Sequence, residues 1–599
     1  MNAALSERLR RIHQQVTAAL LAEVGPDGHW VGELSSSALS TATAVLALST
    51  VDRSAHAGLI RGGLQWLADH ANADGGWGDT VRSRSNLSTT SLVWAAYGAA
   101  GADADYPAVL ANAVHYLTRC AGSLDQLVPA IEAVYGKDRT FSVPITMTLA
   151  LSGRLGPRGW QRVRPLPFEL AALPRGLFGA LRLPVVSYAL PALIAIGQVI
   201  HHRSGRFNPL RSACGRRTLD VLTTLQPDNG GFLEATPLTS FVTMSLAGMS
   251  RSDHPVARRG VSFLVNSVRA DGSWPIDTNL ATWVTTLAVK ALRHTDHGLA
   301  PEHRKQLHSW LLAQQYQQQH PYTGAAPGGW AWTDLPGGVP DADDTAGALL
   351  ALSVLGESRS APDTATQRAA TSGVEWLLNL QNRDGGMPTF CRGWGTLPFD
   401  RSTPELTAHA LRAWAAWWPH LPSNQQPRVK RAADRALASL TAVLTTEGTW
   451  IPLWFGHEAA PGQMNPVYGT AQVLLALAEI RASGWTLAPE TEARARRWLL
   501  QAQHATGGWG GAVGLLPSVE ETSLVLSALI DWPEAKHACE RGAEWLCQQF
   551  ESETPVTPTP IGLYFAQLWY FERLYPLVFA ADALGRLNRI PTVFKGPER

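Results

Sequence analysis

The sequence is poor in cysteine, in net charge and in strand-forming patterns. Its five cysteines lie far apart and form no CxxC pair, which argues against a disulfide scaffold or a zinc knuckle and suits a reducing, cytoplasmic compartment. Lys and Arg number 50 and Asp and Glu number 49, so the basic excess of a nucleic-acid binder is missing and we expect no nucleic-acid partner. With 45% apolar and 17% charged residues, a disordered chain is excluded.

Long uninterrupted hydrophobic runs are also missing. Segment 1–25 predicts an amphipathic helix and no signal peptide, because it has neither a long apolar core nor a small-residue cleavage site. The apolar stretch 183–200 is interrupted by Pro184 and Pro191 and is borderline against the roughly 20 apolar residues that a spanning helix needs. We keep two interpretations of it, a buried helix and an interfacial surface segment, with a transmembrane span as a third.

Tryptophan, in contrast, is abundant, with 23 residues against 15 Phe and 11 Tyr. Many of the tryptophans follow glycine in a recurring unit: an apolar helix, then Gln or Asp, then Gly-Gly-Trp, a turn and a second apolar helix. From residue 274 onward the unit recurs about every 60 residues, which is the signature of stacked helix pairs. The repeat positions are Trp30, Trp77, Phe232, Trp274, Trp330, Met387, Trp450 and Trp509.

Each unit predicts two kinds of helix. The segment WLLNLQNRDGG at 376–386 ends a helix with glycine as its C-cap, and the segment TAGALLALSVLG at 345–356 is apolar nearly all round. A helix of the second kind belongs inside a barrel wall. We therefore predict an all-α chain of paired helices closed into α-barrels, in which tryptophans such as Trp77 and Trp509 tie the repeats together.

Three carboxylates are crowded at the start of one apolar helix, at Asp341, Asp343 and Asp344. Like-charge repulsion keeps one carboxyl of such a group protonated, and hydrogen bonds to its incipient carboxylate keep it acidic. That combination suits protonation of an isolated alkene, which needs an unusually strong acid. The alternative is structural, because carboxylates that follow Pro340 also suit the positive end of a helix.

A histidine lies on a second apolar helix. Thr403 is the predicted N-cap and Pro404 the first helical residue, so Glu405 and His409 lie one turn apart on the same face. A surface ion pair is the alternative, but the apolar neighbours in TPELTAHALRAW favour a functional pair.

The Gly-Gly-Trp repeats (the QW motif), PDADDTAGALLAL at 340–352 and TFCRGWGTLPFDRSTPELTAHAL at 389–411 together resemble the squalene-hopene cyclases. These are class II terpene cyclases of the prenyltransferase–squalene oxidase repeat superfamily, which fold a linear polyene and protonate it. The likeness runs over nearly the whole chain. It implies two α/α-barrel (toroid) domains, one inserted into the other, with the reaction cavity between them.

On this resemblance, residues 1–20 and 290–599 form the catalytic barrel that carries the DxDD motif. Residues 21–289 form the inserted barrel, with the apolar segment 165–200 as its candidate membrane contact. The segment between Met387 and the histidine helix is shorter than is usual in the family, which leaves the preferred substrate length open.

The resemblance also implies residue roles. Asp343 is the expected proton donor, assisted by Asp341 and Asp344, while His409 hydrogen-bonds to it and Glu405 supports the histidine. Oxidosqualene cyclases carry a cysteine beside the catalytic aspartate, so this acid motif points to a non-epoxidised alkene. Residues expected to line the cavity and stabilise cations, with ordinary core packing as the alternative for each, are Trp332, Trp330, Phe390, Cys391, Trp454, Tyr564, Phe565 and Phe571.

The predicted reaction is the protonation-initiated cyclisation of squalene or a similar linear polyprene to a polycyclic triterpene, an isomerase reaction that needs no cofactor and no metal. The expected partners are a hydrophobic isoprenoid substrate, a peripheral membrane surface and a second copy of the chain in a homodimer.

Other functions stay open. A class II cyclase of prenyl diphosphates would need Lys and Arg, often with Mg²⁺, at the diphosphate, and Lys137, Arg139 and Arg392 are the candidates, although solvated loop charges explain them better. A polyprenylated arene is a further substrate class. A non-catalytic α-barrel binding module, or a zinc-dependent barrel like the protein prenyltransferase β subunit, fits less well, because no combination of Cys and His makes a persuasive zinc site.

Overall fold

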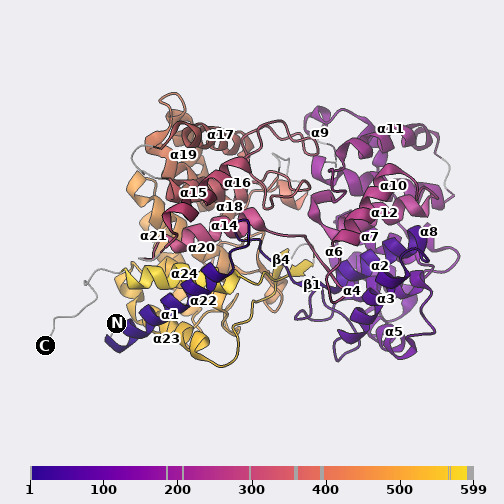
Figure 1. Cartoon of the computed structure of the whole chain (residues 1–599), viewed down its shortest axis with the longest axis horizontal. Coiled ribbons are helices and arrows are strands. Elements are labelled where there is room, and N and C mark those ends of the chain that lie inside the picture. Colours follow the sequence, from indigo (N-terminus) through magenta and orange to yellow (C-terminus); the bar gives the residue numbers. More distant parts are fainter. Residues whose placement is uncertain are drawn as a thin grey trace.

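The apolar segments of the repeats form helices, and the helices gather in two bodies joined by loops and short strands (Figure 1). The computed structural model describes residues 3–589 except 182, 184–185, 206–207, 296–297, 357–361, 391–396, 564–565 and 567. Its helical barrels confirm the all-α, α/α-barrel fold class predicted from the sequence.

The first body is a closed double ring. In the described chain six inner helices pack side by side, and the last closes on the first. They are buried nearly all round, whereas each outer helix buries one face against its inner partner. The inner helices are α14 (Ala281–Leu292), α16 (Ala342–Leu355), α18 (Pro404–Trp417), α20 (Pro466–Ile480), α22 (Val519–Leu529) and α24 (Tyr575–Asn588). The outer helices are α15 (Pro301–Ala313), α17 (Thr364–Leu380), α19 (Gln426–Ala442), α21 (Pro489–Gln501), α23 (Lys536–Glu551) and α1 (Ala3–Ala22).

The second body has the same plan with a smaller inner ring. Its inner helices are α2 (Ala38–Asp52), α4 (Leu87–Ala100), α7 (Arg139–Leu151), α10 (Leu190–Arg203) and α12 (Thr236–Gly248). The surrounding helices are α3 (Ala57–Asp69), α5 (Pro107–Ala121), α6 (Leu127–Tyr135), α8 (Gly159–Arg162), α9 (Gly176–Ala180), α11 (Pro209–Leu225) and α13 (Pro255–Asn266).

The apolar stretch 183–200 supplies inner helix α10, and the side chains of Leu190 and of 193–200 are buried. The buried Gln198 of this helix donates to the carbonyl of Gly215 and to the hydroxyl of Thr218 on α11. The buried-helix interpretation therefore holds for this part of the segment. Within the described ranges, every helix is too short or too polar to cross a bilayer.

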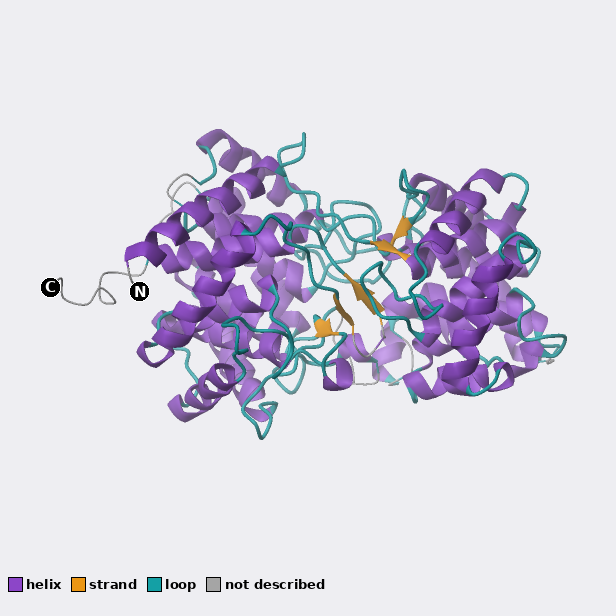
Figure 2. Ribbon diagram, turned by 90° about the horizontal axis from the view of Figure 1, so that it is seen from below, coloured by secondary structure: helices purple, strands orange, loops and turns teal. Residues whose placement is uncertain are grey.

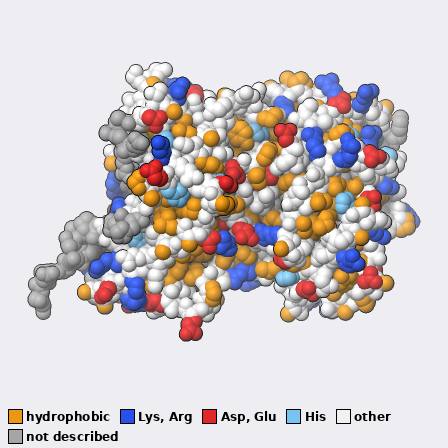
Figure 3. Space-filling model, in the orientation of Figure 1, with side chains coloured by type: hydrophobic (Ala, Val, Ile, Leu, Met, Phe, Trp, Pro, Cys, Tyr) orange, Lys and Arg blue, Asp and Glu red, His pale blue; other side chains and the backbone are white. Residues whose placement is uncertain are grey.

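Short antiparallel strands lie between the two bodies (Figure 2). Strand β1 (Ser36–Ser37) pairs with β2 (Trp274–Pro275), with Ser36 opposite Pro275. Strands β3 (Gly456–His457), β4 (Ile561–Leu563) and β5 (Leu568–Tyr570) form a sheet in that order, with Gly562 opposite Gly456 on one side and Trp569 on the other. Charged side chains of both signs are interspersed over the face of the molecule in Figure 3.

The hydrophobic core divides into two clusters that follow the two bodies. One cluster contains the buried face of α1, Trp30 and the helices from α14 to α24, and the other contains the buried residues between Ala38 and Trp274. The chain thus passes from one core to the other at 30–38 and returns at 274–283. The domain limits suggested by the sequence, 1–20 with 290–599 and 21–289, stay a prediction, and α14 packs with the first body.

Every repeat position is held by the same hydrogen bond. The backbone N–H of the repeat residue donates to a threonine hydroxyl on an inner helix, at 2.9–3.1 Å. For Trp30, Trp77, Phe232, Trp274, Trp330, Met387, Trp450 and Trp509 the threonines are Thr285, Thr90, Thr239, Thr41, Thr345, Thr407, Thr470 and Thr522, respectively.

The tryptophans among them are anchored a second time, because each indole Nε1–H donates at 2.7–2.8 Å to a leucine carbonyl near the end of the preceding helix. The glutamine of the motif adds a bridge between neighbouring repeats. Gln381 Nε2, for example, donates to the carbonyl of Gly385 in its own turn and to that of Ala432 on the next outer helix. Gln226, Gln315 and Gln503 repeat this arrangement. Because successive repeats make the same contacts, these contacts explain why the Gly-Gly-Trp unit recurs at a regular spacing.

We predict that Gln381→Ala lowers the thermal unfolding midpoint, because two buried carbonyls lose their donor at a cost of about 1–3 kcal/mol each. Differential scanning calorimetry at a fixed scan rate measures the change. Gln14→Ala, at an exposed position of α1, is the matched control and should leave the midpoint unchanged. Equal midpoints for the two variants would contradict a structural bridge.

Candidate active site

The three carboxylates at the start of α16 have three different environments. Asp341 is the N-cap of the helix, and its Oδ1 accepts the backbone N–H groups of Asp343 and Asp344, both at 2.9 Å. Its side chain is 3% exposed, and burial raises its pKa to about 7. The structural alternative thus describes what Asp341 does: it holds the first turn of the helix in place.

Asp343 and Asp344 differ in burial and in partner. The Asp343 side chain is 21% exposed, and its Oδ1 lies 2.6 Å from His409 Nδ1. Asp344 is 4% exposed, and burial beside Asp341 and Asp343 raises its pKa well above the usual range. Of the three carboxyl groups, Asp343 is therefore the one that combines a histidine partner with open surface.

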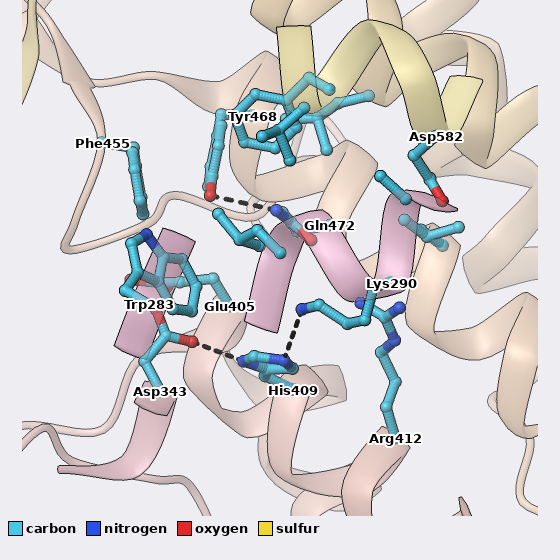
Figure 4. A pocket seen from close by; sticks show the side chains of 16 residues that line it. Trp283, Lys290, Asp343, Glu405, His409, Arg412, Phe455, Tyr468, Gln472 and Asp582 are labelled. Carbon is cyan, nitrogen blue, oxygen red and sulfur yellow. Dashed lines mark hydrogen bonds and ion pairs between the residues drawn. The ribbon is translucent and has the colours of Figure 1, made fainter. Parts of the chain in front are cut away.

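His409 bridges Asp343 and a buried lysine (Figure 4). It lies on α18, and its Nε2 is 3.4 Å from Lys290 Nζ on α14. Its ring and that of Trp283 are close to perpendicular, with 6.2 Å between the ring centroids. Burial and the charge of Lys290 lower the pKa of His409 to about 4, and burial and the neighbouring Arg412 lower the pKa of Lys290 to about 7. His409 is thus neutral near pH 7.

Glu405 makes no hydrogen bond to His409 in the described structure, so the support that the resemblance implied stays a prediction. Its Oε1 accepts the backbone N–H groups of Leu453, at 2.8 Å, and Trp454, at 3.1 Å. The two ring nitrogens of His409 face Asp343 and Lys290 instead. Glu405 therefore fixes the loop that carries Trp454, and burial raises the pKa of its carboxyl to about 7.

A cavity of about 60 Å³ inside the first barrel begins at Asp343 and His409. Phe455 and Tyr468 stack over it, with ring centroids 4.5 Å apart, and Gln472 Nε2 donates to the Tyr468 hydroxyl at 3.0 Å (Figure 4). The remaining polar residues that line it are Lys290, Glu405, Arg412 and Asp582.

Three of the predicted aromatic residues come together between the bodies. Phe390 lies 6.2 Å from Trp332 and 6.5 Å from Trp454, measured between ring centroids. Tyr188 of the second body and Phe399 complete this aromatic cluster, each within 5.5 Å of Phe390. The cluster adjoins the acid helix, because the carbonyl of Thr389, next to Phe390, accepts the backbone N–H of Ala342.

Two predicted cavity residues have other surroundings. Trp330 is fully buried, and its indole donates to the carbonyl of Leu311 like the other repeat tryptophans, so it belongs to the repeat framework and not to the cavity. The Phe571 ring is covered by the guanidinium of Arg82, 5.8 Å from its centroid, which does not suit a ring that stabilises a carbocation. Cys391, Tyr564 and Phe565, and likewise Arg392, lie outside the described residues.

Sequence reasoning missed several residues that line the cavity, namely Trp283, Lys290, Phe455, Tyr468 and Gln472. For Lys290 a signal exists, because it is the single charged residue in the apolar helix 281–292. For Phe455 and Tyr468 the sequence offers nothing beyond their aromatic character, since their meeting with Asp343 depends on how the repeats close into a ring.

The comparisons with known proteins agree with this fold. The family profile described as squalene-hopene cyclase C-terminal domain matches residues 280–587, and that of the squalene-hopene cyclase N-terminal domain matches residues 13–209. The chain therefore belongs to the squalene-hopene cyclase family. It is a member of the class II terpene cyclases, a group of helical-barrel enzymes.

Individual relatives are distant. The chain is 24% identical over 595 residues to the squalene hopane cyclase afumA of Aspergillus fumigatus, covering 82% of this chain and 76% of that protein. It is 26% identical over 616 residues to the terpene cyclase–glycosyl transferase fusion protein fsoA of Humicola fuscoatra, covering 87% of this chain. It spans less than half, 45%, of that fusion protein's length.

Among solved structures, the ent-copalyl diphosphate synthase from Streptomyces platensis has a TM-score of 0.57 and 19% identity, and the match covers 97% of this chain and 99% of that one. This likeness shows that the fold is shared.

We predict that Glu405→Ala loosens the loop around Trp454. Removing the acceptor of two buried N–H groups costs about 1–3 kcal/mol, so amide exchange at residues 453 and 454 should rise at least about tenfold. Hydrogen–deuterium exchange of peptides spanning 449–456 measures the effect. Glu447→Ala, at an exposed neighbouring turn position, is the control. Unchanged exchange in Glu405→Ala would show that other contacts hold the loop.

Proposed function

We propose that this class II terpene cyclase uses Asp343 to protonate a terminal alkene of squalene or a similar linear polyprene, and that it releases a polycyclic triterpene. The observation that carries the proposal is the pairing of Asp343 with His409 on a carboxyl that keeps 21% of its surface open, while Asp341 and Asp344 are buried.

The proton transfer uses groups that are already in place. The proton of Asp343 forms a new C–H bond with one alkene carbon, which leaves a carbocation on the other carbon and a carboxylate on Asp343. A hydrogen bond from His409 Nδ1 at 2.6 Å stabilises that carboxylate as it forms. Burial raises the pKa of Asp344 well above its usual range, which favours its neutral form and so reduces the negative charge that would weaken the acid.

The carbocation then needs stabilisation without a nucleophile. The faces of Trp332, Phe390 and Trp454 supply it, at about 0.5–2 kcal/mol for each cation–π contact. Phe390 at the centre of the cluster is 7% exposed, and such burial limits the access of water, so successive alkenes of the chain attack the cation first. Loss of a proton or addition of water ends the sequence.

The substrate class is argued from the charges around the site. A prenyl diphosphate needs a cluster of cations, but Lys137 and Arg139 are exposed on the second body, as expected for solvated loop charges. Among the described residues, the ionisable group next to Trp332 is the buried carboxyl of Asp277, which offers a diphosphate no positive charge. An uncharged polyprene fits these surroundings better than a diphosphate does, and the likeness to a squalene hopane cyclase also favours it.

We also propose a peripheral membrane contact on the second body, formed by part of the predicted segment 165–200 and by the start of α11. Leu173, Leu177 and Leu181 are 38%, 39% and 59% exposed, and Leu210 at the start of α11 is 64% exposed. The two segments adjoin, because α11 packs against residues 168–172. Such a patch lets an apolar substrate enter from the bilayer.

We predict that Asp343→Asn abolishes cyclisation, with a loss of at least about 10³-fold, because no acid of comparable strength remains. Gas chromatography–mass spectrometry of products from squalene, and separately from geranylgeranyl and farnesyl diphosphates, measures it, with and without a chelator. Asp363→Asn, which removes the N-cap carboxylate of outer helix α17, is the matched control and should stay active. If a prenyl diphosphate is converted and squalene is not, the function is instead that of a prenyl-diphosphate cyclase.

We predict that the triple variant Leu177→Ser, Leu181→Ser and Leu210→Ser lowers binding to liposomes at least about tenfold, since each change removes apolar surface that would enter the lipid. Flotation assays measure it. Val513→Ser with Leu516→Ser, which alters an equally exposed apolar loop of the first body, is the control. Unchanged flotation of the triple variant would contradict this contact surface.

A further inference from the structure

Lys290 lies where a charged residue is costly. It is 8% exposed on inner helix α14, whose other residues are apolar or hydroxyl-bearing. In the described part of the chain no carboxylate lies within 4 Å of its ammonium group. Its contacts there are His409 Nε2 at 3.4 Å and the face of Trp283, whose centroid is 5.7 Å from Nζ. A buried ammonium without a directly paired carboxylate is unfavourable, so its position calls for a chemical reason.

An ammonium group has three N–H donors and no acceptor. When Lys290 is charged, His409 Nε2 must accept, and the imidazole proton must therefore lie on Nδ1. That N–H then donates to Asp343 Oδ1, which has to be an acceptor. In the protonated carboxyl of Asp343 the proton is consequently on Oδ2. In the other tautomer His409 Nδ1 would be bare and would take a hydrogen bond from the acid proton itself.

We propose that Lys290 is a positioning residue of the acid assembly: its ammonium group holds His409 in the Nδ1–H tautomer and so keeps the acid proton of Asp343 on the oxygen that is free to reach substrate. This inference rests on the proposed function of Asp343. It adds a residue on a third helix, α14, to the pair formed by α16 and α18, and no other residue of the cavity contacts His409 Nε2 in the described structure.

The positioning depends on pH, because a neutral amine can accept a hydrogen bond and no longer dictates the tautomer. Burial and Arg412 lower the pKa of Lys290 to about 7. Lys290 is charged below that pH and loses its charge above it, so the reaction should slow as pH rises through about 7. Charged and titratable groups surround it on every packed element. They are Asp343 and Asp344 on α16, Glu405, His409 and Arg412 on α18, Tyr468 and Glu479 on α20, Asp582 on α24 and Arg293 at the end of α14.

The test compares pH–rate profiles of the full-length wild type, Lys290→Arg and Lys290→Met with the polyprene that the wild type cyclises. Arginine keeps the N–H donors and stays charged. Lys290→Arg should therefore retain activity at pH 6, and it should lose the alkaline limb of the profile, which is the fall in rate as pH rises through about 7. Lys290→Met should be at least about tenfold slower at pH 6, in the range of a general-acid contribution, and its profile should be flat through pH 7. Arg496→Met, which removes a buried cation that pairs with Glu492 and Glu534, is the matched control and should keep the wild-type profile.

A second readout is independent of turnover. In protein labelled with ¹⁵N-histidine, long-range ¹H–¹⁵N spectra report the tautomer of His409, assigned by the loss of its signals in His409→Asn. The wild type at pH 6 should show Nδ1–H, and Lys290→Met should show a larger share of Nε2–H.

The outcomes separate the two proposals. An Nε2–H tautomer in the wild type would overturn the inference about Lys290, whatever the activity. So would an alkaline limb near pH 7 that persists in Lys290→Arg, because the carboxyls of Asp341 and Glu405, whose pKa values are also about 7, would then be its source. Failure of Asp343→Asn to reduce activity would instead overturn the proposed function and leave the tautomer measurement valid.

Discussion

The whole molecule depends on one hydrogen bond made eight times in the described repeats, from the backbone N–H of the repeat residue to a threonine hydroxyl on an inner helix. The donor belongs to a turn and the acceptor to a barrel wall, so each bond fixes a loop against the ring at the mouth of a barrel. Where the repeat residue is tryptophan, its indole anchors the same turn to the preceding helix. The first turn of each inner helix is therefore held in a defined position, and the side chains on that turn are held with it.

The proposed acid and its histidine use this framework directly. Thr345, which accepts from Trp330, lies two residues after Asp343 on α16. Thr407, which accepts from the repeat residue Met387, lies two residues before His409 on α18. Because α16 and α18 are neighbours in the ring, the two anchored turns bring the carboxyl and the imidazole to 2.6 Å. The threonine of the Asp-x-Asp-Asp-Thr-Ala motif is thus part of the scaffold, whereas Asp343, two residues before it, is the proposed acid.

Local patterns were enough to predict the helix pairs, the acid helix and the histidine helix, because each of these elements is determined by residues that are close together in the sequence. The features that local patterns did not predict depend on contacts between different repeats. The side chain of Glu405 reaches the loop at 453–454 of the next repeat, which its own helix could not reveal. The position of Trp330 follows the same Gly-Gly-Trp rule as Trp77, and applying that rule to it would have excluded it from the cavity. Lys290 was visible as a lone charge in an apolar helix, but its neighbour His409 is more than a hundred residues away in the chain.

The interior of the first barrel has a charged end and an aromatic end, and Asp343 lies between them. Deeper in the barrel, the arginines of α14, α18 and α24 outweigh burial and hold the pKa of Glu479 well below its usual range, so that end contains fixed, paired charges. Toward the second body the surroundings are the rings of Trp332, Phe390 and Trp454. A carboxyl between these regions has paired charges on one side and aromatic rings on the other. An acid is tuned by nearby charged groups and a carbocation is stabilised by aromatic faces, and the barrel places these two kinds of surroundings on opposite sides of one side chain.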